Sequence, residues 1–180
     1  METDYTVSKT NVECYKLRHK SGMYWADITI DSKENTGRIQ VASDFGSWQY
    51  YWGACGCPFK EFLMQIGIDY AASKFGESQW FDFDETIKSY KQGIIELRRY
   101  EHFTAEHARE IYDEIKELAE ESSYHLNDFQ MQIQGKENLM KHFNWCPDVR
   151  HDISPQFKKF WKMIWGVFLE ELKQEINVAV

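Results

Sequence analysis

The stretch "YWADITIDSKENTGRIQVASDFGSWQYYW", residues 24–52, decides the first half of the fold because apolar and polar residues alternate along it. A period of two is typical of a strand with one buried face. Two breaks, at 32–37 and 44–47, each contain a glycine, as hairpin turns do. With 14–18 as a possible first strand, the pattern predicts a four-strand antiparallel meander within residues 12–53.

The chain after Pro58 follows a helical period instead, with apolar residues three and four positions apart. Gly76, Asp82, Asp84 and Thr104 stand where helix ends and caps are expected. The predicted helices are 59–75, ended by Gly76; a helix to about 100, capped by Asp82 or Asp84; 105–122, capped by Thr104; and a short one over 136–143.

The last predicted helix has the strongest apolar pattern in the chain. Ser154 suits the N-cap and Pro155 the first helical position. We expect its apolar stripe to be core; if part of it were exposed, a homodimer would be the simplest way to cover it. The stripe consists of Phe157, Phe160, Trp161, Ile164, Trp165, Phe168, Leu169, Leu172 and Ile176.

A sheet followed by helices predicts an α+β fold, with four or five helices packed on one face of the N-terminal antiparallel sheet. A length of 180 residues is enough to bury one sizeable core. We therefore predict a single domain over 1–180, with the sheet in 12–53 and the helical part in 58–176.

The charge balance disfavours general binding to phosphate backbones or anionic membranes, because 29 acidic against 21 basic residues give a net charge of −8. No apolar run approaches the roughly 20 residues that span a bilayer. The first residues, "METDYTVSKTNVE", lack the basic and apolar regions of a signal peptide. We expect a cytoplasmic protein with reduced cysteines.

A metal centre is one interpretation of the cysteines and histidines. Cys55 and Cys57 could supply two thiolates, and Cys146, His142 and His151 could complete a tetrahedral zinc site. A single residue between two cysteine ligands is an uncommon spacing, however, and a strand-to-helix corner explains the same residues. We expect no metal, no cofactor and no catalytic residues; an enzyme centred on Cys55, Cys57 or His151 is the less favoured hypothesis.

Three further carboxylates have two interpretations. Asp82, Asp84 and Glu85 could bind a hard cation. They also stand at a predicted helix N-terminus, where the helix dipole favours negative charge without any metal.

The aromatic residues of the sheet suggest a second possible site. If Trp48 and Trp52 face the core, Trp25 and Tyr51 face outward, and exposed rings on a sheet can stack on nucleic-acid bases. The sequence shows no lysine or arginine interleaved with these rings. A small nucleic-acid-binding module that uses Trp25 and Tyr51 is the alternative function.

The predicted helix 105–122 carries a row of carboxylates on one face. The spacings of four, three, four and three residues place them on one narrow stripe. The row is either the solvated face of an acidic protein or a mimic of nucleic-acid phosphates, and Glu121, Asp84, Glu85 and Glu96 could widen it. The row consists of Glu106, Glu110, Asp113, Glu117 and Glu120.

Several segments in a fixed order resemble a widespread family of small bacteriophage and prophage accessory proteins. The resemblance lies in "SDFGSWQYYWGACGCPFKEFL", "WFDFDETIKSYKQGIIELRR", "FTAEHAREIYDEI" and "CPDVRHDISPQFKKFWKMIW", and covers about 38–165. It implies a phage setting and supplies no catalytic residues. In that setting the alternative function is a small nucleic-acid-binding module of phage replication or regulation. Proteins of this setting include anti-CRISPR inhibitors that occupy the nucleic-acid channel of a Cas effector.

The leading hypothesis combines this setting with the carboxylate row. It is a phage-encoded accessory protein in the cytoplasm of the bacterial host, which binds and inhibits a defence nuclease complex such as a Cas complex. Its expected contacts with this partner are the five carboxylates from Glu106 to Glu120. We expect neither enzymatic activity nor membrane association.

Overall fold

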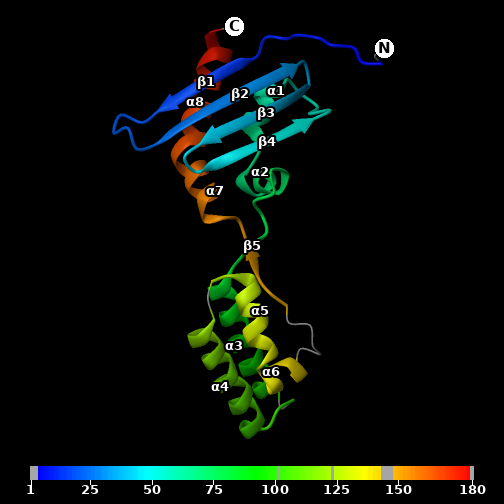
Figure 1. Ribbon diagram of the computed structural model, residues 1–180, viewed down its shortest axis with the longest axis vertical. Helices are drawn as coiled ribbons and strands as arrows, with labels where there is room; N and C mark the ends of the chain where they lie inside the picture. Colours follow the sequence, from blue (N-terminus) through cyan, green and yellow to red (C-terminus); the bar gives the residue numbers. More distant parts are fainter. Residues whose placement is uncertain (1–3, 101, 123, 143–147, 179–180) are drawn as a thin grey trace. The chain divides into compact units, whose positions relative to one another are not determined.

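The computed structural model describes residues 4–100, 102–122, 124–142 and 148–178 (Figure 1). Its α+β fold has an N-terminal four-strand antiparallel sheet followed by helices, as the sequence predicts. The chain forms two compact units: unit 1 comprises Met1–Ser78 and Ile153–Val180, and unit 2 comprises Gln79–Asp152. That residues 1–180 behave as a single domain stays a prediction.

The sheet of unit 1 is the expected meander, in the order β1-β2-β3-β4. Ile28 of β2 is opposite Val41 of β3, which is opposite Trp48 of β4. All three are buried on the inner face, whereas Tyr51 points outward and is 56% exposed, so the predicted alternation is confirmed. The strands are β1 (Glu13–Arg18), β2 (Trp25–Lys33), β3 (Thr36–Ser43) and β4 (Gly46–Trp52).

The corner after β4 is fixed by close packing against the β2–β3 turn. The Cys55 amide donates a hydrogen bond to the Asn35 carbonyl at 2.8 Å. Gly37 must lack a side chain, because a Cβ there would lie 2.5 Å from the Phe59 ring. These contacts support the interpretation of this stretch as a strand-to-helix corner.

The single helix predicted over 59–75 is wrong, because the structure has two helices, α1 (Phe59–Gln65) and α2 (Ile68–Phe75). Ile66 adopts an extended conformation (φ −73°, ψ 137°), and Gly67 precedes α2 without a side-chain cap. The apolar stripe continues across the break because Ile66 still packs against the core. Gly76 ends α2 at φ +79°, a left-handed conformation that favours glycine.

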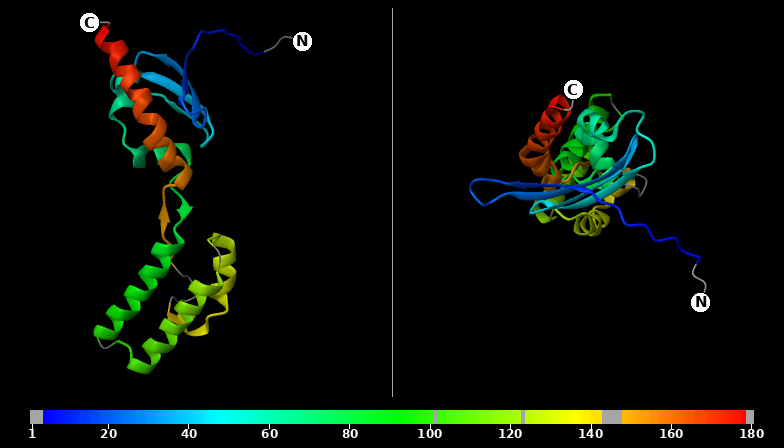
Figure 2. Two further views of the ribbon diagram at one scale, coloured as in Figure 1. Left: turned by 90° about the vertical axis from the view of Figure 1, so that its left-hand side faces the viewer. Right: turned by 90° about the horizontal axis from the view of Figure 1, so that it is seen from above.

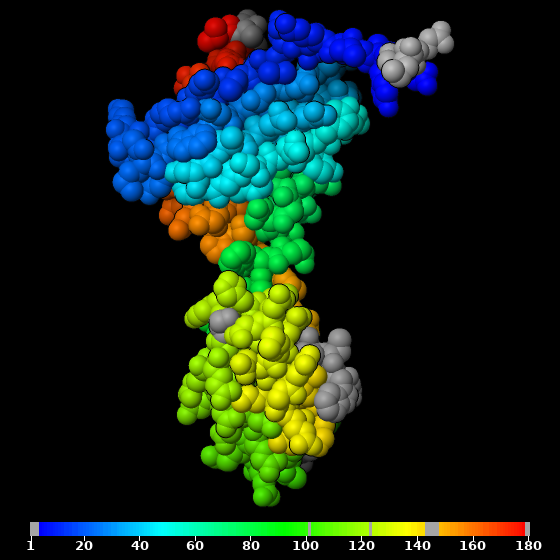
Figure 3. All heavy atoms as spheres, viewed as in Figure 1, coloured from blue at the N-terminus to red at the C-terminus, as the bar shows by residue number. Residues whose placement is uncertain are grey.

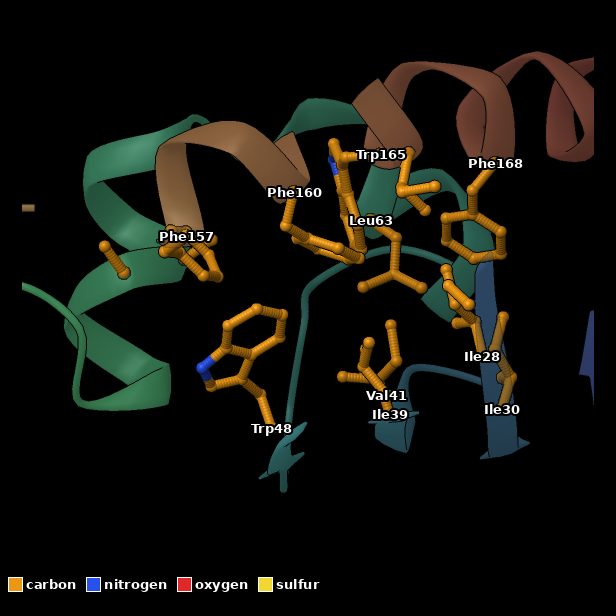
Figure 4. Packing of buried hydrophobic residues seen from close by; sticks show 14 of the residues in the cluster. Ile28, Ile30, Ile39, Val41, Trp48, Leu63, Phe157, Phe160, Trp165 and Phe168 are labelled. Atoms are coloured by element: carbon orange, nitrogen blue, oxygen red, sulfur yellow. The ribbon is translucent and has the colours of Figure 1, made fainter. Parts of the chain in front are cut away.

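The C-terminal helical segment lies across the inner face of the sheet (Figure 2). It consists of α7 (Pro155–Phe160), a π-helical turn η1 (Trp161–Trp165) and α8 (Gly166–Val178). Ser154 caps it by accepting a hydrogen bond from the Phe157 amide. Figure 4 shows its aromatic residues pointing at the strand residues. The stripe is therefore core, as predicted, and exposure of the stripe provides no reason for a homodimer.

Among its described residues, unit 2 has a separate hydrophobic core, formed by side chains of its helices and by Phe81 of a short two-strand ribbon. Here the structure differs from the expectation that the helices pack on the sheet: these helices bury their apolar faces against one another. Helix α5 was not predicted. The elements are β5 (Trp80–Phe81), α3 (Phe83–Arg99), α4 (Ala105–Glu121), α5 (Leu126–Gln134), α6 (Glu137–His142) and β6 (His151–Asp152).

The helix caps of unit 2 agree with the sequence. Asp82 accepts a hydrogen bond from the Glu85 amide at 2.9 Å, and Thr104 accepts one from the His107 amide at 3.2 Å. Such caps satisfy amides that have no partner in the first turn of a helix. Within the described ranges, no helix has the length and apolar character required to cross a membrane.

The separate cores give a first prediction. Phe129 is fully buried in unit 2, so Phe129→Ala should cost about 3–5 kcal/mol of stability there. Hydrogen exchange should then accelerate in α3–α6 while β2 and β3 keep their protection. Met131→Ala, an exposed position on the same helix, is the control and should change little. Equal loss of protection in the sheet would contradict the prediction.

Candidate functional site

Helix α4 presents the predicted carboxylates to solvent. Glu106, Glu110, Asp113, Glu117 and Glu120 are all exposed, whereas Ile111, Ile115 and Leu118 on the opposite face are fully buried. The buried face packs in the core of unit 2, and this contact fixes which way the carboxylates point.

The carboxylates in the C-terminal half of the row have lysine side chains close to them. Lys136, which is only 11% exposed, lies 3.0 Å from Glu117 and 2.9 Å from Glu121. Burial alone would lower the pKa of Lys136, but hydrogen bonds to these carboxylates raise it overall, so the amine stays charged. Lys116 lies 4.0 Å from Glu120.

Within the described residues, no lysine or arginine pairs with the N-terminal half of the row. Glu106 and Asp113 form no ion pair within the described part of the chain, and Glu110 has only His107 beside it, at 3.6 Å. Sequence reasoning missed the neutralisation of the other half, because Lys136 stands 19 positions from Glu117 and meets it only through the packing of the helices.

Glu114 is a carboxylate of α4 with a structural role that the sequence did not reveal. Its Oε1 accepts hydrogen bonds from the Asn138 amide at 3.2 Å and from Asn138 Nδ2 at 2.9 Å. Its Oε2 accepts one from the Leu139 amide at 2.7 Å. Glu114 therefore caps the start of α6 from a neighbouring helix.

The described part of the chain gives no support to the proposed metal site. Within the described residues, no three His, Cys, Asp or Glu side chains are grouped so that they could hold a metal ion. Cys55 and Cys57 belong to unit 1, His142 and His151 belong to unit 2, and Cys146 lies outside the described residues. Burial, and secondarily the nearby Cys57, raises the pKa of the Cys55 thiol, which therefore favours its protonated form.

Asp82 and Glu85, at the start of α3, already have partners in the protein. Asp82 is the N-cap, and Glu85 pairs with Lys88 at 2.8 Å. These contacts, with Asp84 in the first turn of the helix, support the helix-end interpretation of this cluster.

The outward aromatics of the sheet have basic neighbours, and the expectation that none is interleaved with them is wrong. Arg18 is opposite Trp25 and lies over its ring at 5.4 Å, and Arg38 is opposite Tyr51. The sequence did not show this because the pairs form between strands. Figure 3 shows the outer face of the sheet to which they belong.

The two rings are too far apart to stack on neighbouring bases. Tyr51 of β4 is opposite Arg38 of β3, which is opposite Asp31 of β2. Asp31 is six positions from Trp25 along β2, so Tyr51 is displaced from Trp25 by six residues along the strands and by two strands across the sheet. The separation is about 20 Å, since a strand rises ~3.3 Å per residue and strands lie ~4.8 Å apart. Nucleic-acid binding through this face stays a prediction.

A cavity of about 580 Å³ lies in unit 1 beside β1 and the C-terminal helical segment. Its lining includes Leu17 and Lys16 of β1, Ile164 of η1, and Val167 and Glu171 of α8. Sequence reasoning missed it, because strand 14–18 was only a possibility and its position beside the last helix depends on the sheet order.

A polar network fixes β1 to α1 and α8 next to this cavity. The Lys60 amine hydrogen-bonds Glu13 of β1 and, at 2.8 Å, Glu175 of α8. The Tyr15 hydroxyl lies within hydrogen-bonding distance of the same carboxylates, 2.6 Å from Glu13 and 2.9 Å from Glu175, and shares its one proton between them. The hydrogen bonds from Lys60 and then from Tyr15 hold the pKa of Glu13 below its usual value.

Comparison with known proteins places the chain in a phage protein family. A family model described as "Phage family" matches residues 5–175, and the chain belongs to this family. The resemblance to phage proteins is therefore confirmed. Searches of curated proteins and of solved structures found no match.

The different roles of neighbouring carboxylates on α4 give a second prediction. Glu114→Ala removes the cap of α6 and should cost about 1–2 kcal/mol, whereas Glu110→Ala removes an exposed group and should stay within about 0.5 kcal/mol. Urea unfolding of the two variants measures both effects. The assignment fails if the two variants have the same stability.

The network at Lys60 gives a third prediction, for acid pH. The pKa of Glu13 is lower in the folded state than in the unfolded state, where it is about 4.3. Ionised Glu13 therefore stabilises the fold above about pH 4.3, and this stabilisation is lost as the pH falls through the pKa of the folded state. The difference in unfolding free energy between wild type and Lys60→Met should be largest above about pH 5 and shrink below it. Lys173→Met, which removes an exposed pair with Glu170, is the control and should show little difference at any pH.

Proposed function

We propose that this phage protein is a cytoplasmic accessory protein that binds and inhibits a defence nuclease complex of the bacterial host. In this proposal the acidic face of α4 occupies a basic surface that otherwise binds nucleic acid, as in a Cas effector. The observation that carries the proposal is the exposure of all five predicted carboxylates on one face of a helix whose other face is core.

The spacing of these charges supports a nucleic-acid-like contact. Glu106 and Glu120 are 14 positions apart, so five charges span about 21 Å at 1.5 Å per residue. The mean interval is about 5 Å, against ~3.4 Å per phosphate along one DNA strand. The row therefore has about two-thirds of the charge density of one strand, which suits a groove that neutralises phosphates with lysine and arginine.

The ion pairs of α4 indicate which part of the row makes the contact. Lys136 already neutralises part of the charge at Glu117 and Glu121, so this end offers less to a basic partner. Glu106, Glu110 and Asp113 have no lysine or arginine paired with them within the described residues, and they form the free end of the row. We assign the main contact to these three carboxylates, with Glu117 and Glu120 as its continuation.

The fourth prediction tests this contact in cells. In a host whose CRISPR system targets an infecting phage, expression of the wild-type protein should restore plaques, and the triple variant Glu106→Lys, Glu110→Lys, Asp113→Lys should not. Charge reversal replaces attraction to a basic groove by repulsion. A purified effector should correspondingly lose target cleavage with the wild-type protein and keep it with the variant.

The control variant carries the same charge change in unit 1, as Asp4→Lys, Asp31→Lys and Glu34→Lys, all exposed positions. It should inhibit like the wild type, which separates a local contact from net charge. Circular dichroism of both triple variants must match the wild type. Inhibition that survives reversal of the α4 carboxylates would refute the assigned contact, and no effect on any defence nuclease would refute the proposed function.

A further inference from the structure

The sheet of unit 1 has an open edge at β1. In the order β1-β2-β3-β4, no described strand pairs with β1 on the side away from β2. Residues 4–12, which precede β1, are exposed and form no strand. An edge strand offers backbone N–H and C=O groups with which an added extended chain can pair.

The cavity of about 580 Å³ lies directly beside this edge and has an apolar interior. Ile164 is buried and Leu17 half-buried, and both belong to its lining. Met163 and Val167, four positions apart on the helix, remain 39% and 61% exposed at its rim. Because alternate side chains of a strand point to one face, a strand beside β1 could place an apolar side chain here.

The charge at this cavity is opposite to that of the chain. Lys16, Arg18 and Lys20 are among the residues around it, against the single carboxylate of Glu171, in a protein of net charge −8. Lys16 and Arg18 alternate with the core-facing Leu17 and point to the outer face of β1. Arg18 is held by Asp27 at 2.6 Å. Lys16 and Lys20 form no ion pair within the described ranges and are available to acidic groups of a ligand.

The same lysine argues against a second copy of this chain as the ligand. A two-fold pairing of β1 strands centred on Lys16 would place two ammonium groups opposite each other, which is destabilising. A pairing centred on Tyr15 would place Lys16 opposite Cys14, which offers no ion pair. The edge therefore favours a strand of different, acidic sequence.

We propose that β1 and the adjoining cavity bind an extended, acidic segment of a partner protein as a fifth strand. An apolar side chain of the segment enters the cavity between Leu17 and Val167, and Asp or Glu residues next to it pair with Lys16 and Lys20. This site is in unit 1, and it is independent of the function proposed for α4.

The test is a selection of short random linear peptides displayed on phage against the full-length protein, followed by fluorescence anisotropy with the synthetic enriched peptide. The expected peptides alternate apolar residues with Asp or Glu. Lys16→Glu with Lys20→Glu should weaken binding about tenfold or more, and Val167→Asp should do the same. Lys33→Glu, a charge reversal of the same kind at a single position of β2 away from the cavity, should have no effect.

Two further measurements decide the mode of binding. Methylation of alternate backbone amides of the peptide should abolish binding if it pairs with β1 as a strand. Hydrogen exchange of the β1 amides should slow when the peptide is bound. The proposal is overturned if no peptide is enriched, if the enriched peptides bind the Lys16→Glu, Lys20→Glu variant equally well, or if oligo(dT) displaces them from the same residues.

Discussion

Unit 1 depends on the packing of its last helical segment against the inner face of its sheet. Phe157 and Phe160 meet Trp48 of β4 at ring distances of 5.1 and 4.8 Å, and Phe168 meets Tyr15 of β1 at 5.3 Å. The segment therefore spans the sheet from one edge to the other. Because the two partners stand at opposite ends of the sequence, the core of unit 1 closes only when the chain returns from unit 2.

The point where the chain leaves unit 1 lies close to the point where it returns. The chain leaves unit 1 after Ser78 and re-enters it at Ile153. At that point the Ser154 amide donates to the Glu77 carbonyl at 2.9 Å, and β5, which begins unit 2, pairs with β6, which ends it. The segments that leave and re-enter unit 1 thus lie next to each other. Unit 2 can therefore be inserted in the sequence between the sheet and the C-terminal helical segment without separating them.

The two proposed binding surfaces have opposite charge. In each, the contacts that a helix or strand makes with the rest of its unit set which of its side chains face solvent. On α4, burial of Ile111 and Ile115 fixes the carboxylates in solvent. At β1, the hydrogen bonds of Lys60 with Glu13 and Glu175 hold the strand against α1 and α8. A core contact on α4 and a polar network at β1 therefore determine which groups are exposed to a partner.

The sequence by itself determined the local structure, because periodicity, caps and turns act between near neighbours. The four strands, the caps Thr104 and Ser154, a cap at either Asp82 or Asp84, and the buried C-terminal stripe all followed from such patterns. Only the tertiary structure decided that Lys136 neutralises Glu117, that Glu114 caps α6, that Arg18 and Arg38 face the outer rings and that β1 borders a cavity. These depend on contacts between distant positions, which periodicity does not encode.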